Sequence, residues 1–128
     1  MSDILTVEII TPNKTILKTE TSEVIIPSYE GQMGILKNHI PLITFLRPGI
    51  ISIIDQEKKY YVEEGTVEFS NNNLLILTST VRDIADLNQS SIEDLLNKAE
   101  IKLRDTNSSD KEKYTLSFKI STLKEINR

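Results

Sequence analysis

The first 80 residues alternate short apolar runs with turn residues, a pattern that predicts β-strands. In the first run, Leu5, Val7 and Ile9 occupy every second position, which places them on one face of a strand. Seven similar runs follow, each next to turn residues such as Gly, Pro, Asn and Asp. The later runs cover residues 16–20, 23–26, 40–46, 50–54, 60–63, 66–69 and 74–78. Short strands at this spacing favour a sandwich or barrel over repeated βαβ units.

The third run ends at Pro27 and is followed by a predicted loop over residues 28–34 that contains two glycines. Their spacing is too short for a dinucleotide-binding loop. Because glycine tolerates tight turns, we expect a loop tip that lets a partner's backbone approach closely. Beside the glycines, Met33, Ile35 and Leu36 have two interpretations: they pack into the core, or they form an exposed contact patch.

After the strands, β-branched residues become fewer and a helical pattern begins. Ser90 and Glu93 are spaced as a capping box, in which each side chain bonds to the other residue's backbone N–H. The apolar positions that follow share one helical face: Ile92, Leu95, Leu96, Ala99 and Leu103. Ile101 lies off this face. We expect the helix to end near Asp105, before a polar connection at residues 106–109.

A second capping box, formed by Ser109 and Glu112, predicts the start of another helix. The sequence beyond it fits two structures. Residues 114–120 alternate as in a strand, whereas Leu116 and Ile120 are spaced as in a helix. The cap and the absence of turn residues favour an antiparallel helical hairpin.

Composition narrows the classes of function. The 128 residues include 19 acidic and 15 basic side chains, a net charge of −4, which does not favour nucleic-acid binding. Residues 1–85 hold 11 acids and 7 bases and residues 86–128 hold eight of each, so we predict a β domain over 1–85 and a helical domain over 86–128. No apolar run is long enough to span a bilayer and no signal peptide is visible, so a cytosolic location is expected.

Candidate catalytic chemistry is sparse. The chain has no cysteine, which excludes disulfides and thiolate ligands, and the single histidine, His39, leaves little for a metal site. No P-loop or G-x-S-x-G motif is present, and we interpret His39 as a structural or interface residue. Glu63 and Glu64 are interpreted as solvated turn charges. We therefore expect no catalytic residue, no metal and no cofactor, and we predict that the chain binds another protein.

One long segment carries a resemblance to a known family. Residues 30–44 read EGQMGILKNHIPLIT, and they are preceded by LTVEIITP at residues 5–12 and followed by LRPG at 46–49 and YYVEEGTVE at 60–68. In this order and spacing the chain resembles the epsilon subunits of F-type ATP synthases, called delta in mitochondria. The resemblance implies a ten-stranded β-sandwich of two five-stranded sheets, followed by a C-terminal antiparallel two-helix hairpin.

The resemblance also implies a role without catalysis. It implies a subunit of the rotary central stalk that couples rotation of the c-ring to ATP synthesis through the gamma subunit. Such a subunit is peripheral to the cytoplasmic face of the bacterial plasma membrane. By position in the motif, the c-ring-facing loop corresponds to Gly31, Gln32, Met33 and Gly34, and the gamma contact to His39, Pro41 and Leu42. The family often has an acidic residue where Gln32 stands.

The hairpin carries further family properties. In many bacterial members it extends toward the alpha/beta catalytic head, contacts it transiently and inhibits ATP hydrolysis. Some members bind ATP through the motif Leu/Ile-Asp-x-x-Arg-Ala, whose first, second, fifth and sixth positions correspond here to Leu87, Asn88, Ser91 and Ile92. The lost arginine removes a bidentate phosphate partner, so we expect weak or absent ATP binding.

Other interpretations stay open at this stage. The basic side chains of the second helix either face acidic surfaces in an inhibitory state or lie on a solvated helix face: Lys111, Lys113, Lys119, Lys124 and Arg128. The alternatives to a coupling subunit are an ATP-sensing regulatory switch, a stand-alone β-sandwich binding module and, least favoured, a hydrolytic enzyme.

Overall fold

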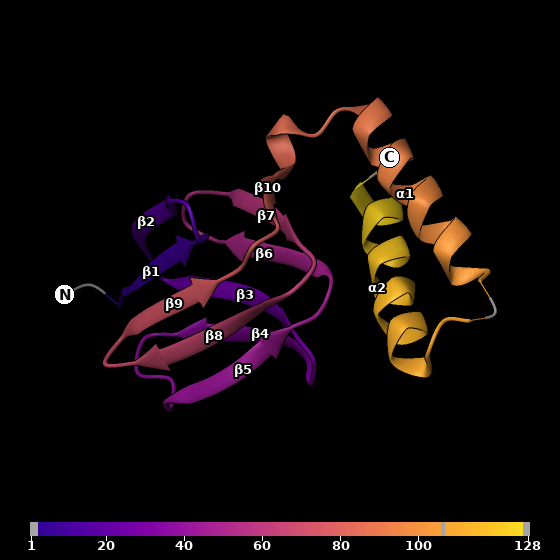
Figure 1. Cartoon of the computed structure of the whole chain (residues 1–128). Helices are drawn as coiled ribbons and strands as arrows, with labels where there is room; N and C mark the ends of the chain where they lie inside the picture. Colours follow the sequence, from indigo (N-terminus) through magenta and orange to yellow (C-terminus); the bar gives the residue numbers. More distant parts are fainter. Residues whose placement is uncertain (1–2, 106, 127–128) are drawn as a thin grey trace.

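The computed structural model describes residues 3–105 and 107–126 as a β-sandwich followed by two helices (Figure 1). The strands are β1 Leu5–Ile10, β2 Thr15–Thr21, β3 Glu23–Ser28, β4 Gly31–Leu36, β5 Leu42–Leu46, β6 Gly49–Ile53, β7 Lys58–Val62, β8 Gly65–Ser70, β9 Asn73–Leu77 and β10 Val81–Asp83. The helices are the 3-10 turn η1 Ile84–Asp86, α1 Gln89–Leu103 and α2 Asp110–Ile126. Of the residues discussed above, Thr106 and Arg128 lie outside the described residues.

The ten strands form two layers. One layer has the order β10-β7-β6-β3-β4 and the other has the order β5-β8-β9-β1-β2. The layers are joined at one place, where Ser28 at the end of β3 pairs with Leu46 at the end of β5. β1 and β9 run parallel, and the other paired strands are antiparallel. The expected sandwich of two five-stranded sheets is confirmed.

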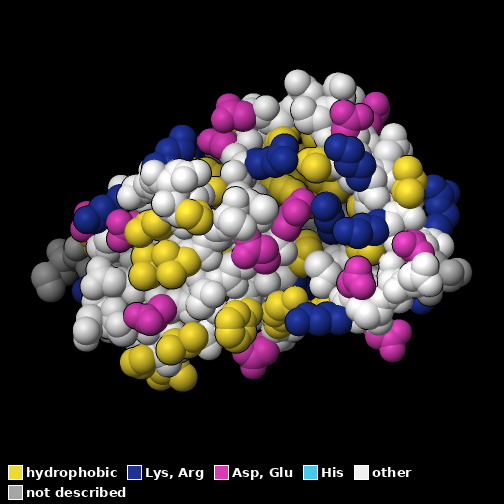
Figure 2. Space-filling view, in the orientation of Figure 1, with side chains coloured by type: hydrophobic (Ala, Val, Ile, Leu, Met, Phe, Trp, Pro, Cys, Tyr) yellow, Lys and Arg dark blue, Asp and Glu magenta, His cyan; other side chains and the backbone are white. Residues whose placement is uncertain are grey.

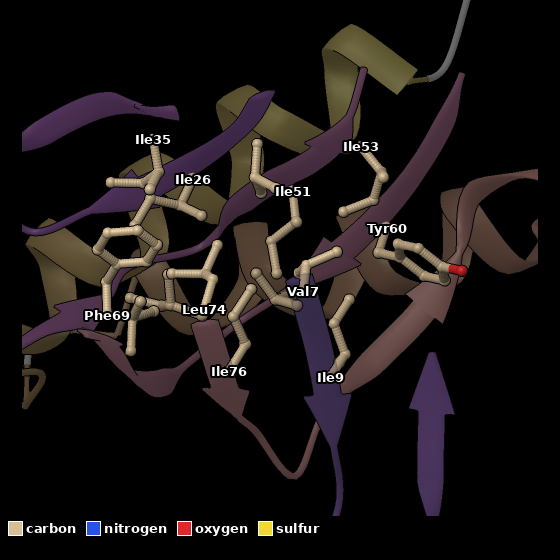
Figure 3. Packing of buried hydrophobic residues seen from close by; sticks show 14 of the residues in the cluster. Val7, Ile9, Ile26, Ile35, Ile51, Ile53, Tyr60, Phe69, Leu74 and Ile76 are labelled. Carbon is tan, nitrogen blue, oxygen red and sulfur yellow. The ribbon is translucent and has the colours of Figure 1, made fainter. Parts of the chain in front are cut away.

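The core lies between the layers and is made by the inward positions of both. On β1, Leu5, Val7 and Ile9 are buried and the residues between them are half-buried, as the alternation predicted. Ile51 and Ile53 of β6 lie across the core from Val7 and Ile9 (Figure 3). Burial of this many branched aliphatic and aromatic side chains supplies the main driving force for folding.

The eight predicted strands are confirmed, but the sequence pattern did not predict β4 and β10. The predicted loop at residues 28–34 is wrong, because all but its first three residues belong to β4. The predicted end of the third strand at Pro27 is also wrong, since β3 continues through it to Ser28. Pro27 lies between the stretch of β3 that pairs with β6 and the residue that pairs with β5, so its missing N–H interrupts neither pairing.

The C-terminal segment is helical, which resolves the ambiguity at residues 114–120. The second capping box is confirmed by both of its bonds: the Glu112 N–H donates to Ser109 Oγ over 3.1 Å, and the Ser109 N–H donates to Glu112 Oε1 over 3.2 Å. The predicted capping box of Ser90 and Glu93 is wrong. The N-cap of α1 is Asn88, whose Oδ1 accepts the Ser91 N–H at 2.8 Å, so the helix begins earlier than expected.

Candidate protein-binding site

The most exposed apolar strand of the sandwich is β5. Its inward residues Thr44 and Leu46 are buried, whereas Ile43 is 70% exposed and Phe45 is 60% exposed. Figure 2 shows hydrophobic side chains in separate groups on this side of the sandwich, with acidic side chains among them. Large apolar side chains this open to water lose the free energy that burial would provide, so they mark a candidate contact surface.

Strand pairing extends this surface across the layer. Phe45 pairs with Thr66 of β8, which pairs with Leu77 of β9, which pairs with Ile10 of β1. A second row runs from Ile43 through Glu68 and Leu75 to Glu8. We call these two rows the outer β5–β9 face. Because a pleated sheet places paired residues on the same side, this face offers apolar side chains interleaved with two carboxylates.

The predicted gamma-contact residues lie where β4 is connected to β5. His39 is half-buried, its ring packs edge-on against Phe69 at 6.0 Å between centroids, and its Nδ1 lies 2.8 Å from the Ile40 carbonyl oxygen. Pro41 is exposed and Leu42 packs partly against the core. The more open residue of this segment is Ile40, which is 74% exposed.

The residues predicted to form a c-ring-facing loop lie in β4. Gly31 and Gln32 pair with Ser28 and Pro27 of β3, so β3 and β4 form a β-hairpin. We call the turn that precedes Gly31 the tip of this β-hairpin. Gln32 and Gly34 are exposed, and Met33 packs against the core.

The two predicted partner sites are therefore separated. Gly31 begins β4, whereas His39 follows its end, with the His39 N–H donating to the Leu36 carbonyl oxygen at 3.1 Å. Six residues of extended chain span about 20 Å. The structure thus places the tip and the His39 segment at opposite ends of the sandwich.

The apolar residues beside the glycines divide between the two interpretations left open by the sequence. Ile35 is fully buried in the core and Met33 packs against it, whereas Leu36 is exposed. The larger exposed apolar side chains therefore lie on β5, and β4 contributes only Leu36. Ile43 and Phe45 were missed by sequence reasoning, although residues 42–46 are apolar on both faces, and a strand that is apolar on both faces at a sheet surface is the signal that would have found them.

The C-terminal helical hairpin packs through a small cluster on the layer of the sandwich that contains β7. Tyr61 of β7 contacts Ile92 of α1 and Leu123 of α2, and all three are buried. The Tyr61 hydroxyl donates to Glu63 Oε2 at 3.0 Å, and Lys119 Nζ lies 3.1 Å from the same oxygen. Burial, followed by the charge and hydrogen bond of Glu63, raises the pKa of Tyr61 far above its usual value.

The interpretation of Glu63 and Glu64 as solvated turn charges is wrong for Glu63, which is half-buried, whereas Glu64 is exposed in the connection between β7 and β8. Glu63 joins the sandwich to the hairpin through Tyr61 and Lys119. Glu64 Oε2 accepts bonds from the backbone N–H and the hydroxyl of Ser79, and these bonds hold its pKa below the usual value. Both carboxylates therefore organise loops at one end of the sandwich.

The positions that correspond to the ATP motif are engaged in local structure. Asn88 caps α1 by accepting the Ser91 N–H, Ile92 is buried against Tyr61, and Leu87 packs against the same cluster. An open cavity of about 520 Å³ beside Leu87 and Ser91 is lined by side chains of both charges. Two of them, Lys58 and Asp83, pair at 3.6 Å. This mixed lining does not define an anion site.

Within residues 3–105 and 107–126, no group of three His, Asp or Glu side chains is arranged to hold a metal ion. The same described residues include no helix that is long and apolar enough to cross a membrane.

These features define a β-sandwich protein with a C-terminal helical hairpin and an exposed apolar strand. A family model described as "ATP synthase, Delta/Epsilon chain, beta-sandwich domain" matches residues 4–83. The chain belongs to this family. It is 45% identical to the ATP synthase epsilon chain of Pelagibacter ubique, over 99% of this chain and 100% of the relative.

More distant relatives agree with this assignment. The chloroplastic ATP synthase epsilon chain of Pyropia yezoensis is 36% identical over 91% of this chain and 87% of its own length. A chain in the cryo-EM structure of the Euglena gracilis mitochondrial ATP synthase, titled OSCP/F1/c-ring, shares the fold with a TM-score of 0.74 and 16% identity. That match covers 97% of this chain and 79% of the other.

Proposed function

We propose that this chain is a non-catalytic rotor subunit of an F-type ATP synthase, which couples ion-driven rotation of the c-ring to ATP synthesis through the gamma subunit. The observation that carries the proposal is the exposed pair Ile43 and Phe45 on β5 of a chain that belongs to the epsilon family. A stiff sandwich with an apolar contact strand suits a subunit that transmits force between proteins.

The gamma contact comprises the outer β5–β9 face together with His39, Ile40 and Pro41. The c-ring contact lies at the opposite end of β4, at the turn that precedes Gly31 and at Gln32. In this arrangement the β domain of residues 1–85 holds both partners, and the hairpin of residues 86–128 contacts the catalytic head transiently and inhibits ATP hydrolysis. The complex places the chain at the cytoplasmic face of a bacterial plasma membrane.

The hairpin does not sense ATP with micromolar affinity. The motif arginine is replaced by Ser91, and Asn88 is used as a helix cap by accepting the Ser91 N–H. Titration calorimetry of the full chain with Mg-ATP tests this point. A dissociation constant in the micromolar range would favour the regulatory switch instead.

The gamma contact is tested by replacing Ile43 and Phe45 with serine in the full chain and measuring co-purification with the gamma subunit. We expect at least a tenfold loss of affinity, because truncating central apolar anchors costs about 2 kcal/mol or more. Ile101→Ser, on an exposed face of α1, is the matched control and should bind normally. If the double variant folds and binds gamma like the unaltered chain, the assignment of this face is refuted.

A further inference from the structure

Two asparagines join the connection between β4 and β5 to the turn between β8 and β9. The Asn38 N–H donates to Asn72 Oδ1 at 2.7 Å, and Asn72 Nδ2 donates to Asn38 Oδ1 at 3.3 Å. Figure 1 shows this turn beside the β4–β5 connection, on the side of the sandwich away from the helices. Because β4 and β8 belong to different layers, this amide pair links the layers at a second place, in addition to the pairing of Ser28 with Leu46.

Both asparagines have a backbone conformation that few residues adopt. The φ angle is 67° at Asn38 and 60° at Asn72, in the left-handed region where asparagine is enriched several-fold. Asn72 is also held by its carbonyl oxygen, which accepts the Thr6 N–H at 3.0 Å. Its neighbour Asn71 is left-handed too, with φ of 51°, but its carbonyl oxygen accepts the side-chain amide of Asn73. The turn therefore uses left-handed residues at both positions, whereas the amide pair uses the side chain of Asn72.

The segment that follows the amide pair is anchored on both sides. The His39 ring lies edge-on against Phe69 of β8, and Leu42, at the start of β5, pairs with the same Phe69. Pro41 restricts the residue before it, Ile40, to extended conformations. The backbone around Ile40 is thus constrained, while its side chain is 74% exposed. This short connection holds a large apolar side chain in water.

We propose that Asn38 and Asn72 are positioning residues, which hold Ile40 in the orientation in which it binds the gamma subunit. The inference rests on the proposed function, which places residues 39–41 in the gamma contact. A connection that is already ordered loses less conformational entropy on binding, so a positioned Ile40 binds more tightly than a mobile one. In this role the amide pair acts through Ile40 rather than through a contact of its own.

The test measures the affinity of the full chain for the gamma subunit of its own ATP synthase. Asn72→Gly removes the side-chain amide and keeps the left-handed backbone, because glycine adopts positive φ without steric cost. Asn71→Gly makes the same change one residue earlier in the same turn and is the matched control. We expect Asn72→Gly to weaken binding about fivefold, the effect of about one hydrogen bond, and Asn71→Gly to bind within about twofold of the unaltered chain.

A conservative variant tests the hydrogen bond itself. Asn72→Asp keeps an oxygen that accepts the Asn38 N–H, and aspartate tolerates the left-handed conformation. It should therefore bind gamma more tightly than Asn72→Gly. Equal affinities of Asn72→Asp and Asn72→Gly would show that the bond from the Asn38 N–H does not position the segment.

A double-mutant cycle with Ile40 separates positioning from direct contact. In an Ile40→Ser background there is no apolar side chain to position, so adding Asn72→Gly should weaken binding by less than about twofold. A further fivefold loss in that background would show that Asn72 acts independently of Ile40 and would overturn the inference. In the free chain, the His39 N–H, which donates to the Leu36 carbonyl oxygen, should exchange faster with solvent in Asn72→Gly than in Asn71→Gly.

The outcomes separate this inference from the proposed function. If the unaltered chain does not bind gamma, the proposed function and the positioning role both fail. If the unaltered chain binds gamma and Asn72→Gly binds it as tightly as Asn71→Gly, only the positioning role is refuted. Far-UV circular dichroism checks that each variant is folded.

Discussion

Leu123 is the residue on which docking of the hairpin most depends. It is fully buried, and it fills the space between Tyr61 of the sandwich and Ile92 of α1. Fifteen buried apolar residues form the core between the two layers, whereas three form the cluster beneath the hairpin. The hairpin is therefore the part of the molecule that a single truncation can release.

The expected cost of Leu123→Ala follows from its burial. The change removes three carbon atoms, each of which contributes about 0.8 kcal/mol when buried. A cavity penalty adds to this, so we expect a loss of about 3 kcal/mol. That free energy corresponds to about a hundredfold change in the equilibrium between docked and undocked hairpin.

Native-state amide hydrogen exchange measures this change residue by residue. In Leu123→Ala, amides of α1 and α2 should exchange about a hundredfold faster, while amides of β1 and β9 in the core should keep their protection. Ile101→Ala is the control, since Ile101 is exposed on α1 and its truncation should cost less than about 0.5 kcal/mol. Equal acceleration in β1 and β9 would show that the sandwich and hairpin unfold together and would refute the boundary near residue 85.

Three further predictions concern single residues. The raised pKa of Tyr61 stabilises the fold fully below pH 10 and less as the pH rises above 10, so chemical denaturation should show a flatter dependence on alkaline pH for Tyr61→Phe than for the unaltered chain. Gly49→Ala should lower the midpoint of thermal unfolding, because the added carbon would lie 2.4 Å from Pro27 Cβ; an unchanged midpoint would contradict the close approach. Asn88→Ala should cost about 1 kcal/mol in urea denaturation and Ser90→Ala much less; the opposite order would restore Ser90 as the cap.

The alternation of apolar and polar residues made most of the fold predictable. The strands that this pattern did not predict were missed for local reasons. β4 was missed because glycines occupy two of its six positions, so its alternation rests on the remaining side chains. β10 has only three residues, fewer than a periodic pattern needs. The strand end at Pro27 was predicted wrongly, because a strand tolerates proline only where no neighbouring strand needs its N–H. A single sequence does not specify which strand pairs at that point.

The N-cap of α1 was also not predictable from the local sequence. Asn88 and Ser90 are both good N-cap residues two positions apart, and local preference does not choose between them. Burial of Ile92 beside Tyr61 fixes which face of α1 meets the sandwich. For the second helix the capping-box spacing of Ser109 and Glu112 selected the cap among several polar residues, and its start was predicted correctly.

The candidate site was predictable only in part. The motif directed attention to the segment at His39, but the exposure of Ile43 and Phe45 depends on the layer in which β5 lies. The contacts of α2 with Tyr29 and Glu63 join residues more than fifty positions apart, and no local pattern reports such contacts.

The placement of the tip and His39 at opposite ends of β4 has a mechanical meaning. A β-strand is already close to the full contour length of its backbone, so it cannot lengthen further under tension. A load applied between the two ends would therefore be carried by the covalent chain of β4 and by its whole ladder with β3, rather than absorbed by a slack loop. Two neighbours attached at these ends would be held at a fixed separation.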